Sequence, residues 1–478
     1  MTGPGKFARA SASSSADRRL RANLLRATLI ARGKRLKALS RMADPDAIFQ
    51  AAERARAEAL QNLPELLAML EERVTAAGGQ VHWARDSAEA NRIISEIADS
   101  EGARLAIKGK SMVAEETGLN SALAAVGVEA VEADLGEYIV QLAGEPPSHI
   151  LAPAIHKNRE EIADLFAEKL GADRTSDPGE LTLIARAALR EKFLAADIGI
   201  TGANLCVAET GTVVLVENEG NIRMCATLPR VHVAVTGIEK IVRGMNDAAA
   251  VLNALARSAT GQTLSTYTSF ITGPRGDREA DGPEKFHLVL LDNGRSRIWS
   301  RAEYRDFLRC IRCGSCLYAC PVYERSGGHA YGSAYCGPMG ALMQSLTAKS
   351  PGELPFACTG CGACAEICPV RVDHADMLMR LRAEEVESGG SASILAQGAA
   401  ARFSTLTRLP LAWRAAFAAV RRLDRNLVLA RRMPGYGRIF SNWSKKRRLP
   451  KPAAKPFSSR WPDLKTELER IEKNRRDA

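Results

Sequence analysis

The chain lacks the features of a membrane-spanning or exported protein. Its 478 residues include no apolar run near the ~18 residues that cross a bilayer, and no continuous apolar stretch of signal-peptide length lies near its start. Cysteine is almost absent outside one segment, because nine of the eleven lie between Cys310 and Cys368. Secreted proteins scatter cysteines to staple loops, whereas clustering in a large intracellular chain is typical of metal binding. We therefore expect a cytoplasmic, metal-binding protein.

Two further absences narrow the function. No G-x-G-x-x-G motif follows a predicted strand, so the binding of a nicotinamide cofactor has no support. The absence of this motif does not exclude a flavin site. Aromatic residues make up 5% of the chain and are not interleaved with basic residues, as a groove for nucleic acid would need. The net charge of +11 is confined to the ends, since residues 1–42 carry +10 and residues 401–478 carry +15, leaving −14 between them. No nucleic-acid partner is expected for that acidic body.

The pattern of apolar runs divides the chain into four parts. Residues 1–78 predict a basic N-terminal helical region that is broken or kinked at Pro64. In residues 79–297 short apolar runs alternate with helical windows, which favours an α/β domain with a mostly parallel sheet. Residues 298–390 predict a helical domain with cysteine-bearing loops, and residues 391–478 a basic C-terminal tail. The predicted strands are 80–84, 105–107, 128–133, 150–152, 197–201, 211–216, 231–235 and 287–291.

The tail contains a predicted basic amphipathic helix. Its basic residues are Arg408, Arg414, Arg421, Arg422 and Arg425, and its apolar residues are Leu411, Trp413, Phe417 and Leu423. Such a helix would suit an anionic membrane surface, at the inner face of the membrane. A docking surface for a partner subunit and a solvated face are the alternative interpretations.

The strongest motif, C-x2-C-x2-C-x3-C-P, occurs twice, at residues 310–321 and 358–369. It is the bacterial ferredoxin spacing, in which three cysteines of a loop bind one [4Fe–4S] cluster and the fourth binds the other. The spacing therefore predicts two clusters with crossed ligands. Cluster 1 takes Cys310, Cys313, Cys316 and Cys368, and cluster 2 takes Cys358, Cys361, Cys364 and Cys320.

The alternative metal is zinc, whose sites take four ligands and usually show two separated C-x2-C pairs. Two copies of a three-plus-one motif ending in proline favour iron–sulfur clusters instead. The motifs start 48 residues apart, and the sequence between them reads as helical, so we expect an α-helical ferredoxin domain. Cys336 lies between the motifs and is interpreted as a free buried thiol, with a spare ligand as the alternative.

Short stretches along the chain resemble one known family, the lactate utilization protein B family, an iron–sulfur component of a bacterial L-lactate dehydrogenase complex. The stretches are GQVHWAR (79–85), KGKSMV (108–113), DLGEYIVQ (134–141), PAIHK (153–157), GITGAN (199–204), AETGT (208–212), LPRVH (228–232), LDNGR (291–295) and GGHAYG (327–332). The resemblance covers about residues 45–390 and part of the tail.

This resemblance implies a CoA-transferase-like α/β domain of the LUD type, joined to a two-cluster ferredoxin domain. It also implies two partner proteins with which the family oxidises L-lactate to pyruvate. One departure concerns Cys358, since that position is often not cysteine in the family. Here the second motif is complete. This supports the prediction of two full clusters but leaves the substrate of this subgroup less certain.

Candidate ligand-binding residues of the α/β domain lie at or near predicted strand ends, where open α/β sheets bind ligands. The predicted cationic pocket for a carboxylate consists of Lys108, Lys110, His156 and Lys157, and ordinary loop cations are the alternative. In transferases of the related fold a glutamate acts as nucleophile, which by analogy makes Glu217 a candidate.

The expected function is electron transfer within a complex that oxidises L-lactate, as a relay toward the quinone pool rather than as the substrate-oxidising site. The alternatives in the same class are iron–sulfur subunits for another 2-hydroxy acid or for a polyol phosphate. A nucleic-acid-binding iron–sulfur protein belongs to a different class, as does an acyl or CoA transferase with vestigial clusters that depends on Glu217.

Overall fold

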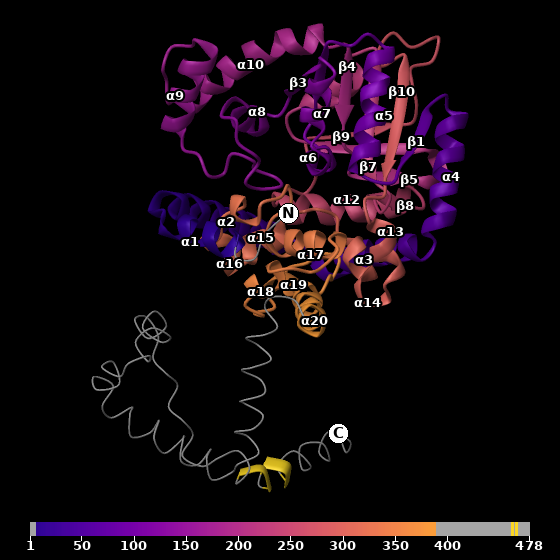
Figure 1. Ribbon diagram of the computed structural model, residues 1–478. Coiled ribbons are helices and arrows are strands. Elements are labelled where there is room, and N and C mark those ends of the chain that lie inside the picture. The colour runs from indigo at the N-terminus through magenta and orange to yellow at the C-terminus, as the bar shows by residue number, and fades with distance from the viewer. Residues whose placement is uncertain (1–5, 389–459, 463, 467–478) are drawn as a thin grey trace. The chain divides into compact units, whose positions relative to one another are not determined.

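The computed structural model describes residues 6–388, 460–462 and 464–466. The chain forms two compact units, Met1–Ser391 and Ala392–Ala478. All strands among the described residues, and all eleven cysteines, belong to the first (Figure 1). The amphipathic helix expected around residues 408–425 lies outside the described residues. The expected boundaries at 78 and 297 fall inside the first unit and stay predictions. None of the described helices is long and apolar enough to span a membrane.

A six-stranded sheet forms the centre of the α/β part, and every neighbouring pair of strands is parallel. The order is β1-β10-β7-β4-β2-β3. The strands are β1 (Gln80–Ala84), β2 (Leu105–Lys108), β3 (Glu129–Glu132), β4 (Ile198–Thr201), β7 (Val231–Gly237) and β10 (Lys285–Leu291). The central strands β4 and β7 are buried along their whole length, as expected for a parallel sheet covered on both faces. The predicted α/β class is confirmed.

A second, mixed sheet of order β8-β5-β6-β9 packs beside the first and was not predicted. Its strands are β5 (Leu205–Val207), β6 (Thr212–Glu217), β8 (Ile241–Val242) and β9 (Tyr267–Ile271). The run predicted at 211–216 as a strand of the parallel sheet is β6, which instead pairs antiparallel with β5 and β9. The neighbours of β6 are therefore the strands β5 and β9 of the second sheet, and not strands of the parallel sheet.

The strand predicted at 150–152 is wrong, because these residues form a loop. The ring of His149 accepts hydrogen bonds from the backbone nitrogens of Leu151 and Ala152 at 3.0 and 3.1 Å. A side chain therefore takes the donors that a strand ladder would have used. Ile150 is buried in the same core as the cysteine-rich helices, so its apolar character reflects that contact.

Helices cover both faces of the parallel sheet. On one face the apolar sides of α5 (Ser87–Ser100), α6 (Met112–Thr117) and α7 (Leu119–Ala125) pack on the strands. The other face is covered by α4 (Leu63–Ala76), α11 (Asn221–Thr227) and the second sheet. The remaining helices of this part are α8 (Leu135–Leu142), α9 (Arg159–Leu170), α10 (Pro178–Ala195), α12 (Met245–Ala259) and the 3-10 turn η1 (Ala208–Thr210).

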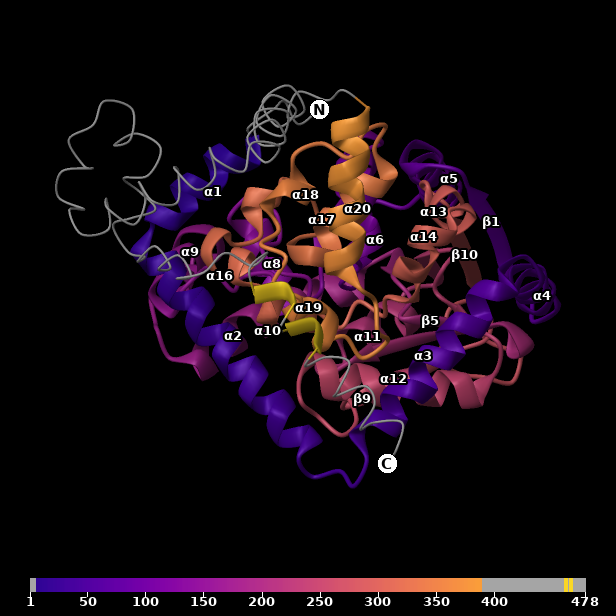
Figure 2. The same cartoon turned by 90° about the horizontal axis from the view of Figure 1, so that it is seen from below.

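The basic N-terminal region consists of α1 (Lys6–Ala16), α2 (Arg18–Leu39) and α3 (Pro45–Gln61). The chain breaks between α3 and α4 at Asn62, and Pro64 lies in the first turn of α4, where proline is tolerated. These helices flank the cysteine-rich helices, as the view from below shows (Figure 2). The N-terminal region is thus part of the shell around the cysteines.

Within the described residues, the cysteine-rich part consists of helices and loops without a strand, in agreement with the helical domain expected for residues 298–390. Its elements are α13 (Arg295–Ser300), α14 (Ala302–Arg305), η2 (Asp306–Arg309), α15 (Ser315–Ala319), α16 (Pro321–Ser326), η3 (His329–Tyr331), α17 (Gly337–Thr347), α18 (Leu354–Ala357), α19 (Ala363–Glu366) and α20 (His374–Glu387). It packs beneath the carboxyl ends of the parallel strands, toward which the β10 arrow points in Figure 1. Glu239, just after β7, pairs with Arg312 of the first cysteine loop at 3.3 Å. The edge at which open α/β sheets bind ligands therefore faces the cysteines.

Candidate metal centre

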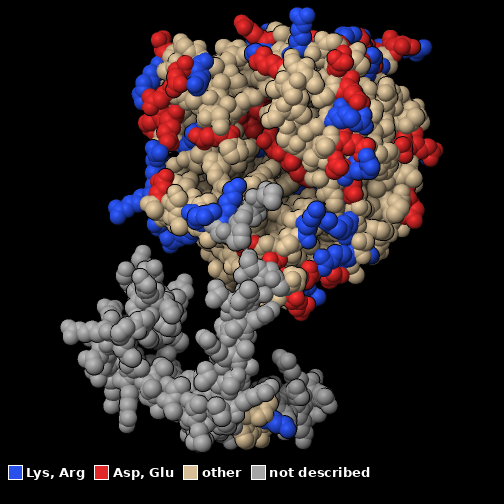
Figure 3. Space-filling view, in the orientation of Figure 1, with Lys and Arg blue, Asp and Glu red and all other residues tan. Residues whose placement is uncertain are grey.

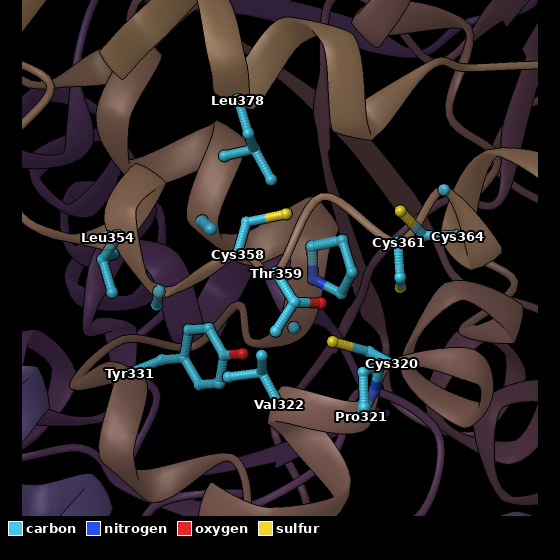
Figure 4. A pocket seen from close by; sticks show the side chains of 15 residues that line it. Cys320, Pro321, Val322, Tyr331, Leu354, Cys358, Thr359, Cys361, Cys364 and Leu378 are labelled. Atoms are coloured by element: carbon cyan, nitrogen blue, oxygen red, sulfur yellow. The ribbon is translucent and has the colours of Figure 1, made fainter. Parts of the chain in front are cut away.

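The eight motif cysteines surround two separate cavities. Cys310, Cys313, Cys316 and Cys368 line one of them, which we name cavity 1. Cys320, Cys358, Cys361 and Cys364 line the other, which we name cavity 2. In Figure 4 the four sulfur atoms of cavity 2 point into a common space, with Tyr331 and Leu378 at its rim. Each cavity thus takes three cysteines from one loop and the fourth from the other motif.

Each cysteine loop turns through a glycine with positive φ and then enters a short helix. Gly314 (φ 72°) precedes α15, which carries Cys316, and Gly362 (φ 76°) precedes α19, which carries Cys364. This left-handed conformation is cheap for glycine alone. The two glycines therefore let the third cysteine of each loop turn back toward the first two.

Backbone N–H groups donate to several of the sulfur atoms. The sulfur of Cys320 accepts from the nitrogen of Tyr323 at 3.5 Å, and that of Cys368 from Val372 at 3.3 Å. In the loops, Cys310 accepts from Arg312 and Cys358 from Gly360. Such bonds favour the thiolate, which is the form that binds iron.

The spread of the thiols fits a cluster better than a single ion. One zinc ion needs all its ligand atoms within ~2.3 Å of a point. Among the described residues no group of three or more His, Cys, Asp or Glu side chains is close enough to hold one ion. A cube carries its four irons at separate corners, so its thiolates must lie apart around a cavity, as they do here.

The electrostatics of the cavities also call for a positively charged occupant. Burial raises the pKa of Cys320 to about 11, and that of Cys364 and of Cys368 to about 12, and the neighbouring thiols add to each shift. Four thiolates cannot be ionised together in such a site without a compensating cation. Iron supplies that charge, and its binding releases the thiol protons.

Cavity 1 is surrounded by basic side chains that sequence reasoning missed. Arg312 has a left-handed backbone (φ 57°), and its guanidinium lies over the ring of Tyr335 and pairs with Glu239. Arg35 donates to the carbonyl of Ile367, next to Cys368. Burial, and next the charge of Arg312, lowers the pKa of Lys240 to about 7. An alignment of the two motifs would have shown Arg312 opposite Gly360, which is the available signal.

Arg56, on α3, fastens the first cysteine loop to the α/β part. Its guanidinium is completely buried and donates to the carbonyls of Leu308 (2.8 Å) and Arg309 (3.4 Å), just before Cys310. It also donates to the carbonyls of Glu239 and Ile241 beyond β7. One side chain thus satisfies acceptors from both parts of the molecule. No local pattern in the sequence marks it.

Cys336 is buried and free, and it contacts the carbonyl of Ser148 at 3.7 Å. It does not occur among the described residues that line cavities 1 and 2. The expectation of a free buried thiol agrees with this position.

The four residues of the predicted cationic pocket are each engaged by other groups. Lys108 is buried and pairs with Glu132 at 2.7 Å and Glu115 at 2.9 Å. Burial alone would lower its pKa, but these two carboxylates raise it overall. The ammonium of Lys108 is thereby neutralised within the fold.

The other three members form two further groups. Lys110 donates to the carbonyl of Leu151 at 2.8 Å, whereas His156 and Lys157 both contact Glu145 at 2.7 Å. The carboxylate pocket therefore stays a prediction without a free cation to support it.

Glu217 caps a helix. Its two carboxylate oxygens accept from the backbone nitrogens of Ile222 and Arg223, both at 2.7 Å, at the start of α11. Burial raises its pKa, and these hydrogen bonds oppose that shift. Its role as a nucleophile stays a prediction by analogy.

Two family models match the two parts of the chain. The LUD domain matches residues 67–291, and the 4Fe-4S dicluster domain matches residues 306–372. The second match contains all eight cysteines of the two cavities. The first contains both sheets.

Three relatives show the extent of the similarity. An Escherichia coli K12 protein named "Uncharacterized electron transport protein YkgF" is 43% identical over 85% of this chain and 86% of its own length. Lactate utilization protein B of Macrococcus caseolyticus is 48% identical over 70% of this chain and 71% of its own. Lactate utilization protein B of Bacillus cereus B4264 is 41% identical over 90% of this chain and 91% of its own length.

Proposed function

The chain belongs to the lactate utilization protein B family, and from that premise we propose that it is the iron–sulfur electron-transfer subunit of a complex that oxidises L-lactate to pyruvate. The observation that carries this proposal is the pair of four-cysteine cavities. When bound, a [4Fe–4S] cluster in each would accept one electron and pass it on. Cavity 1 would hold cluster 1 and cavity 2 would hold cluster 2.

The residues of the chain would hold and shield the clusters. Backbone N–H groups orient the sulfur atoms, and the apolar core around Leu317, Tyr331 and Met339 excludes water. In the α/β part, the cations and the glutamate that could have formed a substrate site are paired within the fold. This supports a relay whose substrate is oxidised in one of two partner subunits. The relay would work in the cytoplasm, at the inner face of the membrane, toward the quinone pool.

The rival functions have less support. Another 2-hydroxy acid or a polyol phosphate would use the same relay, and only the substrate test below separates them from L-lactate. For nucleic acid, blue and red side chains are interspersed over the described face in Figure 3, whereas a binding groove needs a continuous basic track. A transferase would need the carboxylate of Glu217, which caps α11.

Growth on defined carbon sources tests the proposal. A host that lacks its own copy of the gene should fail to grow on L-lactate alone, and the wild-type chain should restore growth. Cys316→Ser should not restore it, whereas Cys225→Ser, a buried cysteine outside both cavities, should. Growth that is lost on glycolate or glycerol 3-phosphate, but kept on L-lactate, would favour the rival substrates.

A further inference from the structure

The two cysteine loops have the same backbone but opposite surroundings. Arg312 and Gly360 occupy equivalent positions, with φ of 57° and 68°, and Gly314 and Gly362 are equivalent at 72° and 76°. Despite this likeness, one loop is enclosed by the fold and the other is at the surface.

The α/β part covers one side of cavity 1, at Gly314. A Cβ added at Gly314 would lie 3.0 Å from the side chain of Leu151 and 3.6 Å from the ring of His149. Cys313 and Cys316 are each only 8% exposed. A protein partner therefore reaches Cys313 and Cys316 less directly than the exposed Cys361 of the other loop.

Cavity 2 opens to the surface through an uncharged face. Thr359, Gly360 and Cys361 are exposed in succession, and Pro321, which follows the fourth ligand, is exposed beside them. Pro321, Thr359 and Cys361 also line the cavity. We name these four residues the cluster-2 face. Atoms of the cluster's own ligand loop are thus within reach of a second protein.

The glycine at 360 is not required by the backbone alone. Arg312 has the same left-handed conformation and carries a full side chain, which reaches Glu239. At Gly360 an added Cβ would meet no atom within 4 Å. The glycine leaves this exposed position of the loop without a side chain.

From this asymmetry we propose that the cluster-2 face is the docking surface for an electron-transfer protein whose redox group reaches its own surface. Cluster 2 is then the cluster that exchanges electrons directly with that protein. This inference rests on the proposed function, because it requires both clusters to be present. It adds where the partner binds and which cluster it meets.

The first test measures cluster exposure without any electron transfer. A soluble gadolinium chelate is added to the dithionite-reduced holoprotein, and the relaxation of the two cluster signals is followed by electron paramagnetic resonance. The chelate should speed the relaxation of one signal and leave the other nearly unchanged. Equal effects on both signals would overturn the asymmetry.

The second test places a side chain on the face. Gly360→Arg copies the residue of the first loop, and Gly360→Gln has similar length without charge. The matched controls are Gly102→Arg and Gly102→Gln, since Gly102 also has positive φ (61°) with open space around it and follows α5 in the α/β part. Iron content and the dithionite-bleached absorbance should equal those of the wild type in all four variants.

The readout is the rate at which reduced protein passes electrons to ferricytochrome c and to ferricyanide. Both Gly360 variants should lower the rate of electron transfer to ferricytochrome c roughly tenfold, which is equivalent to about 1.4 kcal/mol of docking free energy. The rate of electron transfer to ferricyanide should stay within about twofold of the wild-type rate. The Gly102 variants should change neither rate. If only Gly360→Arg lowers the rate of electron transfer to ferricytochrome c, or if neither Gly360 variant does, the docking surface lies elsewhere. A wild-type protein that dithionite does not bleach would instead refute the proposed function.

Discussion

Arg295 and Glu116 form a buried, bidentate ion pair in which the two terminal nitrogens of the guanidinium donate to the two carboxylate oxygens at 2.9 and 2.7 Å. The same carboxylate accepts the hydroxyl of Tyr335 at 2.8 Å, from the segment between the cysteine motifs. Because Glu116 lies on α6 and Arg295 begins α13, the pair ties the carboxyl edge of the parallel sheet to the cysteine-rich helices.

Replacing Glu116 should destabilise the protein strongly. Glu116→Gln leaves the completely buried guanidinium of Arg295 with Glu239 as its remaining carboxylate. Removing one partner of a buried pair costs on the order of 3 kcal/mol. The control is Glu96→Gln, whose partner Arg92 is exposed and whose loss should cost less than about 1 kcal/mol. Urea unfolding under anaerobic conditions measures both, and equal losses would contradict this view of the pair.

Arg56 should be required for cluster 1 more than for cluster 2. Arg56→Lys keeps the charge, but a single ammonium cannot reach the carbonyls on both sides of the guanidinium. Since Leu308 and Arg309 precede Cys310, we expect the first loop to loosen and iron content to fall to roughly half, as one of two cubes is lost. Arg54→Lys, an exposed position on the same helix, should retain full iron. Equal loss of both cluster signals would contradict the prediction.

The crossed ligand sets make a prediction about single-cysteine variants. Cys368→Ala should alter the same paramagnetic signal as Cys313→Ala, because both cysteines line cavity 1. Cys320→Ala should alter the same signal as Cys361→Ala. If each loop instead kept its own fourth cysteine, the pairing would be reversed. Cys336→Ser should leave both signals unchanged.

His232 should make the fold sensitive to acid. It is fully buried on β7 and shares a 2.8 Å hydrogen bond with Thr201, and burial lowers its pKa to about 3. In the unfolded chain its pKa is about 6.5. Its contribution to stability is therefore complete above pH 6.5 and is lost as the pH falls toward 3, at about 1.4 kcal/mol per pH unit.

The measurement is the free energy of unfolding as a function of pH between about pH 6.5 and 5. The slope of this free energy against pH should be steeper for the wild type than for His232→Gln, by the amount that corresponds to the uptake of about one more proton on unfolding. The neighbouring His287, whose pKa is lowered to about 4 by burial, remains in both proteins and so cancels in the comparison. Identical slopes would show that His232 is not held neutral in the folded state.

Much of the parallel sheet could be predicted because short apolar-rich runs alternate with helical windows, and 80–84 matches β1 residue for residue. The second sheet could not, since β5 and β8 have only three and two residues and their pairing depends on contacts distant in the sequence. The motif spacing predicted which cysteines meet at each cavity. It carried no information on Arg56, whose partners lie more than 180 residues away.

The predicted cationic pocket shows the same limit. Residue type and position at a strand end suggested Lys108 as a ligand for a carboxylate, but Glu132 and Glu115 supply that carboxylate from within the fold. Sequence alone does not reveal such pairing, because it depends on which neighbours the strands acquire. Exposure is equally hidden: both loops have the same cysteine spacing, and the packing of Leu151 over Gly314 in the first loop is visible only in the structure.

The central claim is that this chain relays electrons through two clusters and leaves substrate oxidation to its partners. The most direct test is the visible spectrum of the anaerobically purified protein alone, before and after L-lactate, with dithionite as the control. We predict that dithionite bleaches the cluster band near ~400 nm, typical of thiolate-bound cubes, and that L-lactate does not. Bleaching by L-lactate alone would place a dehydrogenase site in the α/β part and contradict the account.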